Sequence, residues 1–142
     1  MVDLKNGGIT LNGNNFLIKK GLTKNEFEKS SLFGEVSNHQ AYGFTSYYLK
    51  PQLIGNDKFI LVLYFNQYDV IDFVNLSLSS SNNAPSWNNW SESEELRKKG
   101  EHDKWLLRNI GKPPYKYFWG EISSNYDPRS SSSMITVRYN NI

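Results

Sequence analysis

The stretch FILVLYF at residues 59–65 carries the strongest structural signal in the chain. A strand with one solvent-facing side alternates apolar and polar residues, and this stretch does not alternate. Its length and its content of β-branched and aromatic residues favour a strand over a helix. An unbroken apolar run is typical of a strand that is covered on both faces. We therefore predict that residues 59–65 form the central strand of a sheet.

The segments on either side of this stretch also have the pattern of strands. Residues 70–78 alternate, with Val74 and Leu76 on one face and Asn75 and Ser77 on the other, as in a half-buried strand. An Asn-Gly pair between two short apolar runs provides the positive φ angles of a tight turn and predicts an opening hairpin. That hairpin is expected at residues 9–18, and further strands are expected at residues 41–49, 115–122 and 134–139.

Two helix starts are indicated by capping boxes, in which a Ser or Thr side chain and a Glu three residues later satisfy each other's backbone N–H groups. Thr23 pairs with Glu26 in the first box, and Ser91 pairs with Glu94 in the second. Glycine commonly ends a helix because it adopts the left-handed conformation. The predicted helices are residues 24–32, ended by Gly34, and a segment from Ser91 to about Ile110, ended by Gly111.

The second predicted helix contains Gly100, which costs about 1 kcal/mol relative to alanine in a helix interior. Two shorter helices are therefore a possible alternative to one long helix. Apolar residues at helical spacing predict the stripe that faces the core. The residues near this stripe are Leu96, Asp103, Leu106, Leu107 and Ile110.

Together these elements predict an α+β domain, with a single antiparallel sheet and two helical segments, over residues 1–142. The halves, residues 1–80 and 81–142, share a spacing, because Gly43 follows Gly34 and Gly120 follows Gly111 by nine residues. This spacing predicts two pseudo-repeats of a helix–loop–hairpin unit. If both helices pack on one face of the sheet, a second copy or the N-terminal segment must cover the other face.

Composition excludes several classes of protein. With 15% aromatic residues the chain has too many large apolar groups for disorder. A net charge of +2 without a dense basic stripe is weak for a nucleic-acid binder. The absence of cysteine excludes disulfides and thiolate metal sites. No apolar run approaches the roughly 20 residues that span a bilayer, and the start of the sequence does not resemble a signal peptide. We therefore expect a cytoplasmic protein.

No constellation of residues predicts catalysis. The two histidines are His39 and His102. Asp103 neighbours His102, but adjacent residues of a helix point in different directions, which argues against a catalytic triad. Metal-ligand pairs at helical spacing and phosphate-binding glycine motifs are also missing from the sequence. We expect a protein that is not an enzyme and that needs no cofactor or metal.

Aromatic and charged residues in polar segments are the candidate binding residues. Trp, Tyr and Arg are favoured anchors of protein interfaces, since each buries a large area and keeps a polar group. The alternative for the two tryptophans is that one packs into the core and the other against a helix start. The candidates for binding a partner are Trp87 and Trp90 in one loop, and Tyr126, Asp127 and Arg129 at an exposed tip between two strands.

Three function classes follow from these candidates. The leading hypothesis is a non-enzymatic protein-binding protein whose aromatic loops occlude a partner's active site. The alternative is a small glycan-binding or glycan-cleaving domain, in which Trp87 and Trp90 stack on sugars. The third is a structural homo-oligomer. A nucleic-acid or membrane partner is not expected.

The C-terminal stretch WLLRNIGKPPYKYFWGEISSNYDPRSSSSMITVRY, residues 105–139, resembles small bacterial proteins, some of them similar to immunity proteins of polymorphic toxin systems. The alternation of helix, glycine and aromatic sheet also resembles the β-lactamase-inhibitor proteins, although this chain lacks the cysteines and the signal peptide of those secreted inhibitors. The first resemblance implies a toxin domain as the protein partner and neutralisation by steric occlusion.

Overall fold

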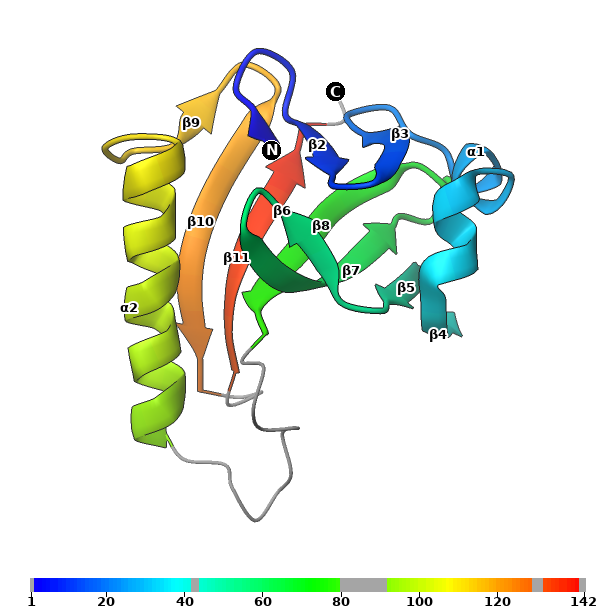
Figure 1. Ribbon diagram of the computed structural model, residues 1–142. Helices are drawn as coiled ribbons and strands as arrows, with labels where there is room; N and C mark the ends of the chain where they lie inside the picture. Colours follow the sequence, from blue (N-terminus) through cyan, green and yellow to red (C-terminus); the bar gives the residue numbers. More distant parts are fainter. Residues whose placement is uncertain (1, 42–43, 80–91, 129–131, 141–142) are drawn as a thin grey trace.

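The computed structural model describes residues 2–41, 44–79, 92–128 and 132–140. They form a mostly β structure with two antiparallel sheets and two α-helices (Figure 1). The prediction of an α+β architecture is confirmed in this broad sense, but the prediction of a single sheet is wrong. The small sheet contains β1 (Val2–Asp3), β2 (Gly8–Leu11) and β3 (Asn14–Ile18).

The main sheet has eight strands, in the order β4-β5-β7-β8-β11-β10-β9, with β6 paired to β7 beside β5. The apolar stretch that dominated the sequence lies in β7, which pairs with other strands along both edges. The strands are β4 (Val36–Ala41), β5 (Thr45–Leu49), β6 (Gln52–Ile54), β7 (Asp57–Phe65), β8 (Ile71–Leu78), β9 (Lys116–Tyr117), β10 (Gly120–Asp127) and β11 (Ser132–Tyr139).

Burial along β7 alternates, which corrects the prediction that both of its faces are covered. Phe59, Leu61, Leu63 and Phe65 are buried, whereas the residues between them are only half-buried. Successive side chains of a strand point to opposite faces. The main sheet therefore has an inner face, which carries these four buried side chains, and an outer face on its other side.

The helices and the small sheet all pack on the inner face. Phe27 of α1 (Lys24–Glu28) lies with its ring centroid 5.8 Å from that of Phe65. Trp105 of α2 (Glu92–Asn109) meets Phe59 at 5.1 Å. The hydroxyl of Tyr139 donates a 2.8 Å hydrogen bond to the backbone oxygen of Gly7, which holds the N-terminal segment against the same face. These contacts form one continuous core.

The predicted first helix is shorter than expected. Thr23 caps α1, and the reciprocal hydrogen bonds with Glu26 confirm the capping box. A separate 3₁₀ helix, η1 (Ser31–Glu35), follows α1. Gly34 lies inside η1 and has no positive φ angle. The prediction that Gly34 ends a continuous helix in the left-handed conformation is therefore wrong.

The second helix, α2, runs without a break through Gly100, so the alternative of two shorter helices is wrong. Its buried side consists of His102, Trp105 and Leu106. Leu96 and Leu107, which we expected in the core, are 47% and 51% exposed. The sheet covers only one narrow side of α2, and these two leucines lie outside it. The predicted N-cap Ser91 lies outside the described residues.

The predicted strand at residues 41–49 corresponds to β5, whereas β4 has no counterpart in the sequence prediction. The predicted strand at residues 115–122 is a hairpin in the structure, which contains β9 and the start of β10. The turn of this hairpin has Gly120 at a φ angle of 152°, which favours glycine. The rings of Tyr117 and Trp119 stack at 5.1 Å across this turn and hold it folded.

The glycine spacing shared by the two halves does not reflect a repeated fold. The chain runs α1-β4-β5-β7 in the first half and α2-β9-β10-β11 in the second. Both helices pack on the inner face, and β7 and β11 run in the same direction because each is antiparallel to β8. However, the two units proceed inward from opposite edges of the sheet. They are mirror images that no rotation superposes, so the prediction of a duplication is wrong.

Gly120 gives a direct test of the β9–β10 turn. A Cβ atom at this position would overlap the backbone oxygen of Arg138, and the φ angle already disfavours other residues. We expect Gly120→Ala to lower the free energy of unfolding by about 3 kcal/mol, measured by urea denaturation. Gly34→Ala is the control, since its Cβ meets nothing within 4 Å, and equal effects of the two variants would contradict this account of the turn.

Candidate functional site

The structure describes two of the five predicted binding residues. Tyr126 and Asp127 lie in β10, where they pair with Ser133 and Ser132 of β11. Both are half-buried. The prediction that they form an exposed loop tip is therefore wrong, because the hairpin continues through their polar sequence. Trp87, Trp90 and Arg129 lie outside the described residues, and the role of all five residues in binding a partner stays a prediction.

The outer face of the main sheet is the larger candidate surface. Within the described part of the chain, the helices and the small sheet pack on the inner face, and no element covers the outer one. Its side chains are mostly half-exposed and include many rings and apolar groups. The apolar and aromatic members include Tyr48, Ile60, Val62, Tyr64, Phe73 and Met134.

One row of side chains crosses five strands of this face. The pairing registers place Lys116 beside Glu121, Glu121 beside Arg138, Arg138 beside Phe73 and Phe73 beside Tyr64. Neighbours across strands on one face are close enough to interact. We call these five residues the outer row.

The outer row is ordered by ring and cation contacts at its centre. Tyr64 and Phe73 stack with ring centroids 4.2 Å apart and an interplanar angle of 17°. The guanidinium carbon of Arg138 lies 4.6 Å from the centroid of Phe73, within the range of a cation–π contact. Asp72 holds Arg138 from the side, with a nitrogen-to-oxygen distance of 3.8 Å. Both faces of the Phe73 ring are thus occupied within the protein.

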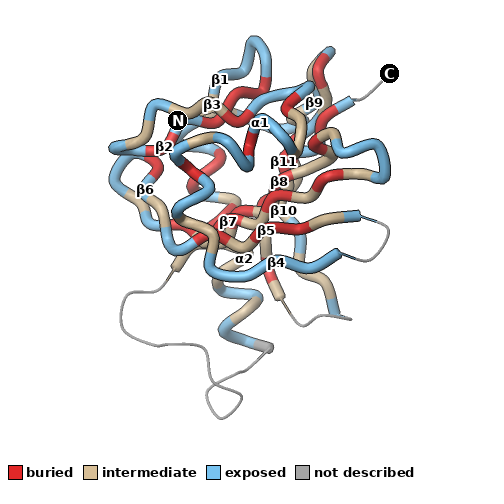
Figure 2. The backbone as a smooth tube through the Cα atoms, turned by 90° about the vertical axis from the view of Figure 1, so that its right-hand side faces the viewer, coloured by how far each residue is buried: buried red, intermediate tan, exposed pale blue. Residues whose placement is uncertain are grey.

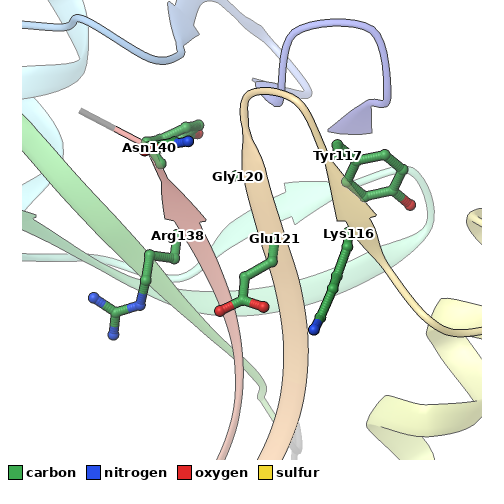
Figure 3. A pocket seen from close by; sticks show the side chains of 7 residues that line it. Lys116, Tyr117, Gly120, Glu121, Arg138 and Asn140 are labelled. Atoms are coloured by element: carbon green, nitrogen blue, oxygen red, sulfur yellow. The ribbon is translucent and has the colours of Figure 1, made fainter. Parts of the chain in front are cut away.

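The charged end of the outer row borders a hollow of about 360 Å³ (Figure 3). The side chains of Lys116, Glu121 and Arg138 lie side by side there, on three adjacent strands. Among the described residues, Glu121 forms no ion pair with either cation. This end of the surface therefore presents charges of both signs to a partner.

Tyr64 provides a neutral hydroxyl beside the rings. Burial raises the pKa of Tyr64, and the neighbouring Tyr48 raises it further. The hydroxyl stays protonated at neutral pH and can donate a hydrogen bond. A second polar pair lies one row further along the same face, where the hydroxyl of Thr136 donates to Asn75 at 2.7 Å.

The surroundings of His102 indicate a structural role. It is fully buried between α2 and β8, and its Nε2 accepts a 3.0 Å hydrogen bond from the backbone N–H of Leu78. Its Nδ1 has no hydrogen-bond partner in the described structure. Burial, with a smaller contribution from the charge of Lys98, lowers the pKa of His102 to about 4. The imidazole is therefore neutral at physiological pH and inaccessible to a substrate.

The described residues contain no group of three His, Asp or Glu side chains placed to hold a metal ion. Nor do they include a helix that is both long and apolar enough to cross a membrane. His39, the other histidine, is exposed on β4, and its ring centroid lies 6.1 Å from that of Tyr47.

Comparison with known proteins gives no further assignment. No family model matches the chain, and no curated protein or solved structure matches it either. The structure itself defines an α+β domain in which elements of the described residues cover one face of the main sheet and not the other.

Sequence reasoning missed Tyr64, Phe73 and Arg138. These residues lie on three different strands, and only the pairing register brings them together. One signal was present in the alternation of residues 70–78. It puts Phe73 on the same face as Asn75 and Ser77, which is the polar face of that strand. A large aromatic ring on the polar face of a strand indicates a candidate binding surface.

The environment of His102 predicts that stability depends on pH. The unfolded chain has the ordinary histidine pKa of 6.5, whereas the folded pKa is about 4. Between these values the unfolded chain binds a proton that the folded protein excludes. Above about pH 6.5, His102 therefore causes no loss in the free energy of unfolding. As the pH drops from there towards about 4, this group lowers the free energy of unfolding by about 3 kcal/mol.

His102→Gln keeps an acceptor for Leu78 but does not titrate. We expect this variant to lose most of the decrease in unfolding free energy between about pH 7 and about pH 4.5, measured by urea denaturation. His39→Gln is the matched control because His39 is exposed, and it should keep the full decrease. An unchanged pH slope in His102→Gln would refute the assignment.

Proposed function

We propose that this protein is a non-enzymatic protein-binding protein and that the outer face of its main sheet is the binding surface. The observation that carries the proposal is the outer row, in which Tyr64, Phe73 and Arg138 form a half-exposed, ordered stack on a sheet face that no described element covers.

The chemistry of this face is that of a protein interface. Interface cores are enriched in Tyr, Phe, Met and Arg and depleted in Lys, Glu and Asp. The centre of the outer face has this composition, with Tyr48, Tyr64, Phe73, Met134 and Arg138. The charged residues Lys116 and Glu121 lie at the margin, where charges mainly tune the rate of association and the choice of partner.

The arrangement of the rings favours a protein over a base or a sugar as the partner. Bases and sugars bind by stacking on an exposed ring face. The ring of Phe73 has Tyr64 on one face and Arg138 on the other. It presents an edge, which packs well against the irregular surface of a protein.

Within this class we propose a toxin-neutralising immunity protein that acts by steric occlusion. A broad and pre-ordered sheet face can cover an active site without chemistry of its own. Binding to a pre-ordered surface loses little side-chain entropy, which supports a tight complex. The partner would then be an enzyme whose activity falls as the complex forms.

A capture experiment tests the proposal. The tagged protein is used to capture partners from its native host, and the captured protein is then titrated in purified form. We expect Tyr64→Ala and Arg138→Ala each to weaken binding by about tenfold or more, because residues of these types are typical hot spots.

Tyr68→Ala is the matched control. Tyr68 is 77% exposed on the turn between β7 and β8 and is not part of the outer row. The variant Tyr68→Ala should bind the partner with the same affinity as the unchanged protein. A partner that binds all three variants equally would refute the outer face as the interface. A bound partner enzyme that retains full activity would refute the occlusion mechanism.

A further inference from the structure

A second surface lies at the edge of the main sheet, between β10 and α2. These two elements run alongside each other in Figure 1, and residues of both line a hollow of about 550 Å³. Its walls are Asp103 and Leu107 of α2, residues 113–116 of the connection, and residues 121–124 of β10. We call this hollow the edge groove.

The lining shows that the groove runs beside the strand and not above it. Four consecutive residues of β10 border it, from Glu121 to Ser124. Alternate side chains of a strand point to opposite faces. A hollow that all four residues border must therefore lie along the backbone edge of β10.

In the described part of the chain, that edge is unpaired beyond Ile122 because the neighbouring strand β9 ends. β9 pairs only with Gly120 and Glu121, and one further hydrogen bond runs from the Ile122 N–H to the Tyr115 oxygen at 2.9 Å. Extending this register would place Pro114 and Pro113 next. Proline has no backbone N–H and cannot continue the ladder. In the described structure no strand pairs with β10 beyond this point on that side.

The backbone of Ser124 faces the open side. In an antiparallel ladder, alternate residues direct their N–H and C=O groups to the same side. The Ile122 N–H points towards Tyr115, so the backbone groups of Ser124, two residues later, point into the groove. An extended peptide is the ligand whose own N–H and C=O groups match such an edge.

The opposite wall is apolar and open. Leu107 is 51% exposed, and Pro113 and Pro114 are also exposed. Asp103 and Leu107 follow helical spacing, so they lie on the side of α2 that faces the groove. The remaining lining includes polar groups, among them Lys116 and Ser123. This pairing of an apolar wall with a polar rim matches a strand whose side chains alternate.

The wall is also held in place before any ligand binds. The hydroxyl of Tyr115 donates a 2.9 Å hydrogen bond to the backbone oxygen of Gly111. The backbone oxygen of Tyr115 accepts a hydrogen bond from the backbone N–H of Ile122. Asp103 forms a 2.9 Å ion pair with Lys99. Burial opposes ionisation of Asp103 and is the largest single effect on its pKa, but the hydrogen bond from Lys99, the hydroxyl of Ser124 and the charge of Lys99 together outweigh it and lower the pKa. A fixed groove reduces the entropy lost on binding.

The opposite edge of the sheet lacks these features. β4 is exposed along most of its length (Figure 2). However, the His39 N–H donates to the Asn38 side chain, and the pairing with β5 shifts register between Val36 and Asn38. Side-chain caps and bulges of this kind blunt an edge against pairing. The edge of β10 is instead flanked by a helix, which makes a groove of it.

We infer that the edge groove binds an extended segment of a partner protein, which adds to the main sheet as a strand beside β10. Apolar side chains of that segment contact Leu107 and the proline wall, and its alternate polar side chains face the rim at Lys116 and Ser123. This inference goes beyond the proposed function, because the groove shares only Lys116 and Glu121 with the outer row and takes a different form of partner.

The test uses a phage-displayed library of random linear peptides, panned on the full-length protein. Selected peptides are synthesised with a fluorophore, and their affinities are measured by fluorescence polarisation. We expect selected sequences that alternate apolar and polar residues. We also expect Leu107→Gln to weaken binding by about tenfold or more. Leu53→Gln, at an exposed leucine on β6, and Tyr64→Ala, in the outer row, should leave the affinity unchanged.

Two versions of each peptide distinguish strand addition from other modes of binding. One is N-methylated at odd-numbered amides and the other at even-numbered amides. A strand pairs with its neighbour through alternate residues, so only one version should lose binding. Equal affinities of the two methylated versions, or selected peptides whose affinity Leu107→Gln does not change, would overturn the inference.

The oligomeric state provides a further outcome. The unliganded protein should elute as a monomer in size-exclusion chromatography. A dimer that Leu107→Gln converts to a monomer would assign the groove to a second copy, and this result would also overturn the inference. Loss of partner capture by Tyr64→Ala with unchanged peptide binding would separate the outer face from the groove.

Discussion

The constraint on which the rest of the structure depends is the packing of α1, α2 and the small sheet onto one face of the main sheet. Phe27, Trp105 and Tyr139 tie these three units to that face. No described element is then left to cover the other side. The half-exposed rings of the outer face follow from this unequal distribution, as does the alternating burial of β7. The candidate interface is therefore a result of how the core is built.

Local signals predicted local structure well. The capping box at Thr23 and the alternation of residues 70–78 identified elements that the structure contains. They failed where long-range pairing decides the outcome. Residues 123–127 are Ser- and Asn-rich and were predicted as loop, but their pairing with β11 makes them strand, because β-propensity depends strongly on context. Likewise, the unbroken apolar pattern of residues 59–65 does not show whether the rest of the chain or a partner covers the second face of the strand.

The candidate sites were harder to predict than the fold for the same reason. The outer row combines residues from five strands, and its geometry exists only once the register of each pair is set. The edge groove depends on where β9 stops relative to β10. Lys116 and Glu121 line both hollows, so the outer face and the groove meet at this edge. A partner with a folded body and an extended segment would find both surfaces continuous.

The two prolines after α2 connect the sequence most directly to this arrangement. They lie where the next pairing positions opposite β10 would be, and their missing N–H groups end β9 after two residues. A residue with a donor there could lengthen β9 and close the edge. Exposed edges are normally covered or blunted, and β4 is blunted by its own side chains. Within the residues that the structure describes, one edge of the main sheet is thus protected and the other lies unpaired beside a helix, which is the arrangement that strand addition requires.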